Sequence, residues 1–176
     1  MKNILIFVPH MPFIFDWILA NNLKLISFLD DISHLNYKII LKFHPRHSKI
    51  ELYKTLLHLD NFQVEEGENA HELIESSDLT IAFENSSILF DVIFKEKPLV
   101  YINDYITLFD NESVYHEFLG NITQMSFNDL YFNLKNGFCD KNIETFYPKI
   151  SKKQIFFYLG EDALSMTEKN LKEIIR

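Results

Sequence analysis

Glycine and cysteine are both scarce in this chain of 176 residues, which has four glycines and a single cysteine, Cys139. No Gly-x-Gly-x-x-Gly fingerprint, Walker loop or Gly-x-Ser-x-Gly elbow occurs, which argues against a dinucleotide cofactor and a serine hydrolase. The seven histidines are scattered, with no His-x-x-x-His pair on a predicted helix, so a tetrahedral zinc site has no support. We therefore expect neither a cofactor nor a metal.

Positive charge is also in short supply, because 17 basic residues face 25 acidic ones and the formal net charge is −8. This balance argues against nucleic acid as a partner, since a polyphosphate needs a basic surface. No apolar run approaches the roughly 20 residues of a membrane-spanning helix, and no cleavable signal pattern precedes the first apolar segment. The length suggests one domain over residues 1–176, large enough to bury a full core.

What the chain does contain is a regular alternation of short apolar runs and helical patterns. Alternation of this kind predicts βαβ units, and therefore an α/β fold with a Rossmann-like parallel sheet flanked by helices. The expected strands are Ile4–Val8, Leu35–Phe43, Phe62–Val64, Leu79–Phe83 and Leu99–Ile102, and the expected helices are Phe15–Asp30, Ile50–Leu59, Ala70–Ser76, Ser86–Lys95, Phe127–Asn136 and Met166–Ile175.

The most informative stretch is Leu79–Asn103, where an apolar strand ends at Glu84 and Asn85 and a helix opens on Ser86 and Ser87. A helix N-terminus offers unpaired N–H groups and the positive end of the helix dipole, and the two hydroxyls add further donors. A phosphate would fit this turn. Taken alone, the motif is explained by Asn85 or Ser86 as an ordinary N-cap.

A second strand, in Ile39–Arg46, ends in His44, Pro45 and Arg46. Ligands of an open parallel sheet bind outside the carboxyl ends of its strands, so these residues and the two serines can converge although about 40 residues separate them. Arg46 offers a bidentate fork for phosphate oxygens, and His44 can donate from a ring nitrogen or carry a proton near neutral pH. Together they suit a nucleotide diphosphate. His44 by itself is also compatible with a strand-end histidine bonded to backbone.

The combination of KFHPR with SDLTIAFENSSILFDVIFKEKPLVYIN resembles the HP and Ser-Ser motifs of glycosyltransferases that use CMP- or CDP-activated donors. These include CDP-glycerol glycerophosphotransferases of teichoic acid synthesis, capsule Kdo transferases and bacterial sialyltransferases. Such enzymes have a GT-B architecture, with two Rossmann-like domains facing a cleft. The resemblance covers residues 1–103 best and implies that this chain is one half-domain, the donor-binding C-terminal half.

The resemblance also implies roles for individual residues. His44 and Pro45 would form the HP motif, with His44 as the catalytic group that stabilises charge on the departing nucleotide, and Ser86 and Ser87 would bind the donor phosphate. Arg46 follows the HP motif, where a basic residue is common.

The two residues that precede the serines, Glu84 and Asn85, differ from the sequence found in part of the family. Glu84 lies where it could accept ribose hydroxyls or orient His44. Teichoic acid enzymes tend to read Asp-Tyr-Ser-Ser, whereas this chain reads Glu84-Asn85-Ser86-Ser87, closer to the capsule-type enzymes.

The expected function is thus binding of a CMP- or CDP-activated donor for transfer of a sugar or glycerol phosphate to a surface polysaccharide or teichoic-acid-type acceptor. The chain would act without a metal, with a separate acceptor-binding domain or subunit, in the cytoplasm or peripherally at the inner face of the membrane. Two alternatives remain open at this point. One is a domain like those of UDP-sugar 2-epimerases, which usually have glycine-rich turns; the other is a non-catalytic interaction module with a degenerate site.

Overall fold

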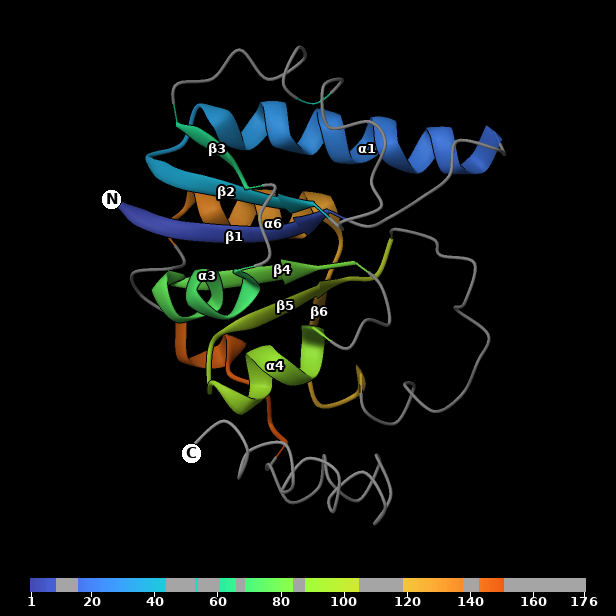
Figure 1. Cartoon of the computed structure of the whole chain (residues 1–176). Coiled ribbons are helices and arrows are strands. Elements are labelled where there is room, and N and C mark those ends of the chain that lie inside the picture. The colour runs from blue at the N-terminus through green and yellow to red at the C-terminus, as the bar shows by residue number, and fades with distance from the viewer. Residues whose placement is uncertain are drawn as a thin grey trace.

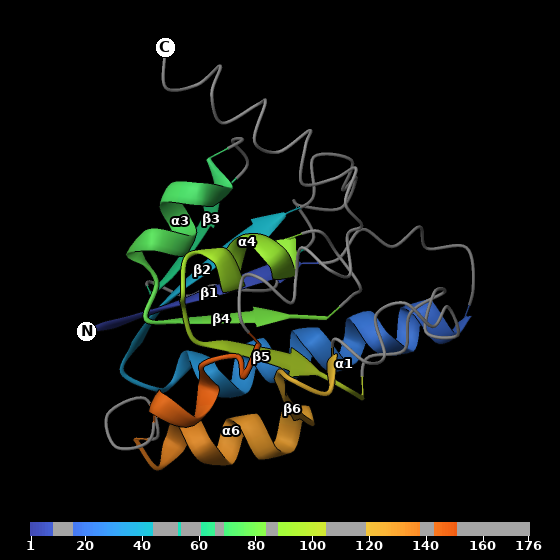
Figure 2. The ribbon, with the colours of Figure 1, turned by 90° about the horizontal axis from the view of Figure 1, so that it is seen from below.

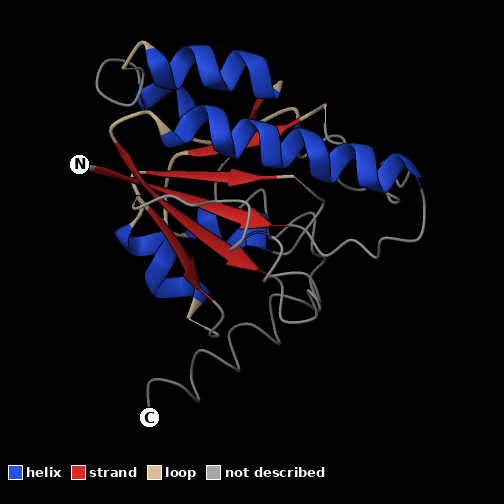
Figure 3. Ribbon diagram, turned by 90° about the horizontal axis from the view of Figure 1, so that it is seen from above, coloured by secondary structure: helices blue, strands red, loops and turns tan. Residues whose placement is uncertain are grey.

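Six parallel strands form the centre of the protein in a computed structural model, which describes residues 1–8, 16–43, 53, 61–65, 69–83, 88–104, 119–137 and 143–150. Their order in the sheet is β3-β2-β1-β4-β5-β6 (Figure 1). Every neighbouring pair is parallel, so the arrowheads point toward one edge in Figure 3. The strands are β1 (Lys2–Val8), β2 (Tyr37–Phe43), β3 (Phe62–Glu65), β4 (Leu79–Ala82), β5 (Leu99–Ile102) and β6 (Thr123–Met125).

Helices occupy both faces of this sheet (Figure 2). They are α1 (Asp16–Ser33), α3 (Ala70–Ser76), α4 (Ile88–Phe94) and α6 (Phe127–Lys135), with a short 3-10 helix, η1 (Ile143–Phe146). The α/β prediction is confirmed, and α3 and β5 have the predicted bounds. The strand β6 and the helix η1 were not predicted, and the helices expected at Ile50–Leu59 and Met166–Ile175 lie outside the described residues, apart from Tyr53, which is helical.

The alternation of side chains along each strand divides the core into two layers. On β1, Ile4, Ile6 and Val8 join the layer that also contains the buried residues of α1 and α6, whereas Leu5 joins the layer beneath α3 and α4. Most of these side chains are fully buried. A sheet buried on both faces needs apolar side chains at nearly every position, which is why the central strands read as continuous apolar runs.

The helices that follow β1 and β4 lie on opposite faces of the sheet. After β1 the chain continues to α1, whose Leu25 and Leu29 lie in the first layer, and after β4 it continues to α4, whose Leu89 and Val92 lie in the second. Because β1 and β4 are neighbours, the topological switch point of the sheet lies between them. This is where ligands bind in open α/β sheets.

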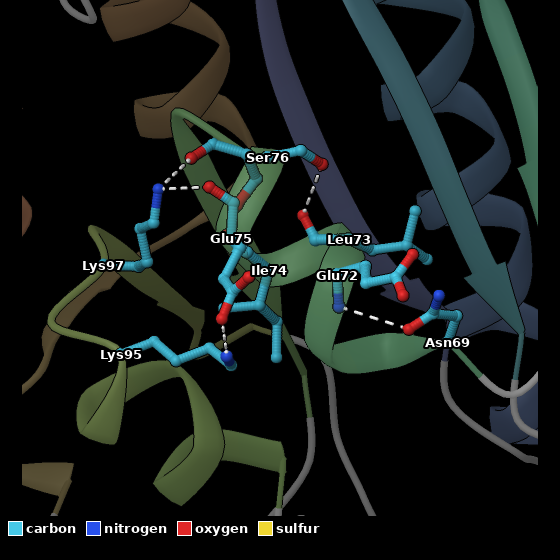
Figure 4. Close-up of polar contacts among 9 residues, drawn as sticks. Asn69, Glu72, Leu73, Ile74, Glu75, Ser76, Lys95 and Lys97 are labelled. Carbon is cyan, nitrogen blue, oxygen red and sulfur yellow. Dashed lines mark hydrogen bonds and ion pairs between the residues drawn. The ribbon is translucent and has the colours of Figure 1, made fainter.

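Polar contacts fix α3 against the segment that follows α4 (Figure 4). Lys95 pairs with the carboxylate of Glu75, and the Nζ atom of Lys97 donates to the backbone oxygens of Glu75 and, at 3.3 Å, of Ser77. At the other end of α3 the side chain of Asn69 accepts from the N–H of Glu72. The ammonium group of Lys97 thus satisfies carbonyls at the C-terminus of α3, where a helix favours positive charge.

No helix among the described residues is both long and apolar enough to cross a membrane.

Candidate functional site at the carboxyl edge of the sheet

The carboxyl ends of β1, β2 and β4 lie side by side. The register pairs Val8 of β1 with Phe43 of β2, and Ile6 of β1 with Ile81 of β4, so the three strands end at nearly the same level. Because β1 lies between them, β2 and β4 are two strand spacings apart, or about 10 Å. The chain leaves this edge into both turns that the sequence singled out.

All seven predicted site residues lie outside the described part of the chain: His44, Pro45, Arg46, Glu84, Asn85, Ser86 and Ser87. Their roles therefore stay predictions. Phe43 directly precedes the first group, Phe83 directly precedes the second, and α4 begins at Ile88, directly after Ser87. A strand therefore ends before the segment 84–87 and a helix begins directly after it.

Aromatic packing anchors the end of β4. Phe83 is 1% exposed, and its ring centroid lies 5.7 Å from that of Phe127 at the start of α6. Phe127 in turn lies 5.0 Å from Phe28 of α1. Aromatic pairs at such separations add to the gain from burial alone. A continuous row of three rings therefore holds the residue next to Glu84 in place.

The end of β2 is packed in a similar way. The ring of Phe43 meets that of Tyr53 edge-on at 5.1 Å, and the hydroxyl of Tyr53 donates to Oδ1 of Asn22 on α1 at 2.9 Å. Both Tyr53 and Asn22 are buried, and burial raises the pKa of the Tyr53 hydroxyl, so it remains a neutral donor. These contacts make the strand end that precedes His44 a rigid support.

Sequence reasoning missed one charged residue at this edge, Lys42. Its side chain is 6% exposed although it lies one residue before the end of β2, and its Nζ atom is buried with no hydrogen-bond partner in the described part of the chain. The signal was available, because Lys42 interrupts an otherwise apolar run, IILKF, in a strand expected to be buried on both faces.

Two acidic residues near this edge, Asp104 and Asp91, have different surroundings. Asp104, which follows β5, accepts from the backbone N–H of Phe127 at 3.1 Å and so caps α6. Asp91, in the first turn of α4, is half-buried, and burial raises the pKa of its carboxyl while the charges of His71 and Lys95 oppose that rise. Asp104 thus has a structural role, whereas Asp91 holds its proton more readily than an exposed aspartate.

The described residues contain no group of three or more His, Cys, Asp or Glu side chains that could hold a metal. A groove of about 220 Å³ lies between α1 and α6, lined by Lys24, Asp31 and Tyr131 among others. A hollow of about 520 Å³ lies at the opposite, amino edge of the sheet, beside Lys2, Tyr37 and Lys135. Neither lies at the switch point, so the candidate site rests on topology and on the chemistry of the turns.

Comparison with known proteins finds similar structures but no similar sequence among family models or curated proteins. The crystal structure of the glycosyltransferase SnogD from Streptomyces nogalater superposes with a TM-score of 0.53 at 18% identity, over 81% of this chain and 36% of SnogD. The chain thus spans about a third of that enzyme.

Two smaller solved structures match over most of their own length. The solution structure of ALG13 has a TM-score of 0.52 at 15% identity, over 90% of this chain and 94% of ALG13. The C-terminal CMP-Kdo binding domain of WaaA from Acinetobacter baumannii has a TM-score of 0.50 at 11% identity, over 82% of this chain and 84% of that domain. At these identities the likeness shows the fold, which is the Rossmann-like fold of a GT-B half-domain.

Proposed function

We propose that this chain is the donor-binding half of a glycosyltransferase that uses a CMP- or CDP-activated donor. The observation that supports the proposal is the arrangement of the two strands that precede the motifs in the sequence: β2 and β4 flank β1 at the topological switch point. A phosphate group bound there would be within reach of turns on both sides.

The residues in those turns suit the chemistry of donor cleavage. When a CMP or CDP group leaves, negative charge builds on its phosphate, and preorganised donors that meet this charge are usually the largest catalytic contribution. Ser86, Ser87 and the N–H groups that open α4 would bind the phosphate, while His44 would donate to it and Arg46 would add a bidentate contact. Glu84 is acidic, so it would accept hydrogen bonds from the ribose hydroxyls of the donor and would not bind the phosphate. No metal is required in this scheme.

The fold is compatible with such a donor, since the WaaA domain is described as binding CMP-Kdo. The group transferred here, and an acceptor of the surface-polysaccharide or teichoic-acid type, follow from the motif resemblance alone. A GT-B enzyme also needs an acceptor-binding half, which in this proposal comes from another domain or subunit.

The test is calorimetric titration of the purified chain with CMP, CDP, UDP and cytidine, using the His44→Ala variant and a Ser86→Ala/Ser87→Ala double variant. His34→Ala is a matched control, because His34 is exposed and precedes β2, whereas His44 follows it. We expect cytidine nucleotides to bind with a phosphate-dependent affinity that falls about tenfold or more in either site variant and is unchanged in the control.

Other results of the titration would favour an alternative function or contradict the site. A preference for UDP would point to the epimerase group, and absence of binding by every nucleotide would point to a non-catalytic module. Equal affinities in the wild type and both site variants would contradict the assignment of the two turns.

A further inference from the structure

Lys42 is a buried cation with no partner in the described part of the chain. Its Nζ atom is shielded from solvent and makes no hydrogen bond with any residue that the structure describes. The register places Lys42 opposite Glu65 of β3 and Phe7 of β1, but the carboxylate of Glu65 instead accepts from the side-chain amide of Gln63. Glu65, the acidic residue opposite Lys42 in the sheet, therefore does not pair with the ammonium.

Such an arrangement is costly for a folded protein. A buried charge without a partner loses its hydration and regains nothing, which is why buried lysines are almost always paired. Packing does not require the charge, since an unbranched apolar side chain of similar length fits the same volume. An ammonium kept at a position like this, with no partner among the described residues, suggests that a bound anion pairs with it.

The position of Lys42 indicates what that partner is. Ile40 lies in the core layer beneath α3 and α4, and since side chains alternate along a strand, Lys42 lies on this same face. It is also next to the carboxyl end of β2. Lys42 and the start of α4 therefore share one face and one edge of the sheet, with β1 between their strands.

We propose that Lys42 is an anion-binding residue whose ammonium pairs with a phosphate oxygen of the ligand at this edge. In the full proposal, which rests on the proposed function, that oxygen belongs to the diphosphate or monophosphate of the nucleotide donor. The buried ammonium supplies a full positive charge at the carboxyl end of β2, on the face of the sheet that α4 covers. The acidic protein can thus hold an anion through a local charge that solvent does not screen.

The test compares Lys42→Met with the wild type and with Lys38→Met. Lys38 lies on the same strand and the same face but is exposed, so it is a matched control. Lys42→Gln is a second neutral variant in case the methionine variant does not fold. Each protein is titrated with CDP, cytidine and inorganic pyrophosphate by calorimetry, and its thermal unfolding is followed with and without pyrophosphate.

We expect Lys42→Met to bind CDP and pyrophosphate about 10- to 100-fold more weakly, with cytidine unaffected and Lys38→Met unchanged. Without ligand, Lys42→Met should unfold at a temperature higher by roughly 3 °C or more, because it removes an unpaired buried charge. An unchanged or lower unfolding temperature would contradict the view that Lys42 is an unpaired buried charge.

The remaining outcomes separate the two proposals. Equal binding of CDP by wild type and Lys42→Met would overturn the role of Lys42 and leave the donor site standing. Stabilisation by pyrophosphate that needs Lys42, without any nucleotide preference, would support Lys42 and overturn the proposed donor. If neither CDP nor pyrophosphate binds the wild type, both proposals are wrong.

Discussion

Phe127 connects the carboxyl end of β4 to two helices, and its truncation tests whether this packing supports the candidate site. The residue is 6% exposed and contacts the rings of Phe28 and Phe83. Replacing a buried phenylalanine by alanine costs about 3–5 kcal/mol, from lost transfer free energy and the cavity left behind. A domain of this size has roughly 5–15 kcal/mol of stability, so Phe127→Ala should remove a large part of it.

Phe132→Ala is the matched control, because Phe132 lies on the same helix but is 63% exposed. We expect it to cost less than about 1 kcal/mol, since it leaves no buried cavity. Urea unfolding followed by circular dichroism measures both variants, and a loss near 4 kcal/mol should lower the unfolding temperature by roughly 8–16 °C. Similar losses in the two variants would refute the argument that the ring row at the end of β4 is a packed core.

Three further predictions concern the helices around the site. Ser126→Ala should cost about 1 kcal/mol in urea unfolding, because its hydroxyl accepts from the N–H of Asp129 at 3.1 Å and caps α6. Tyr37→Phe should cost about 1 kcal/mol in the same assay, since the buried hydroxyl donates to the backbone oxygen of Leu134 at 2.9 Å. The pKa of Asp91 is raised by burial, so the folded state binds its proton more readily and the stability associated with this group is lost as the pH rises through the folded-state pKa. Asp91→Asn should therefore stabilise the protein near pH 7 but not below the pKa of an exposed aspartate, and an equal gain at both pH values in thermal unfolding would contradict this.

The sequence was most informative where secondary structure depends on local pattern. Ala70–Ser76 has an Asn cap before it, and Leu99–Ile102 is a continuous apolar run that follows a proline, so both elements were predicted with the observed bounds. The strand β6 was missed because Thr123–Met125 has three residues, none of them fully buried, and neither apolar run nor alternation can be recognised over so short a stretch. Its place in the sheet comes from pairing with β5, which is a tertiary contact.

The candidate site shows the same division between local and long-range information. The strand-to-turn patterns at Phe43–His44 and at Phe83–Glu84 are visible in the sequence, and the general rule for parallel sheets puts both at one edge. The sequence does not reveal that β1 lies between the two strands, because strand order depends on pairing between segments far apart in the chain. This order is what separates the ends of β2 and β4 by about 10 Å and places the switch point between them.

A separation of this width has a consequence for how an anion can be held. In the proposed function, a phosphate bound beside the end of β4 would lie too far from β2 for a short side chain, so contacts from the β2 side would have to come from long ones. Lys42 is such a side chain, on the correct face of the sheet, and His44 and Arg46 follow it in the sequence. Basic residues are few in this chain and its net charge is −8, yet three residues able to carry positive charge fall within five positions at this strand end. An acidic protein that binds a phosphate needs this local concentration, because the field of the whole molecule repels the ligand.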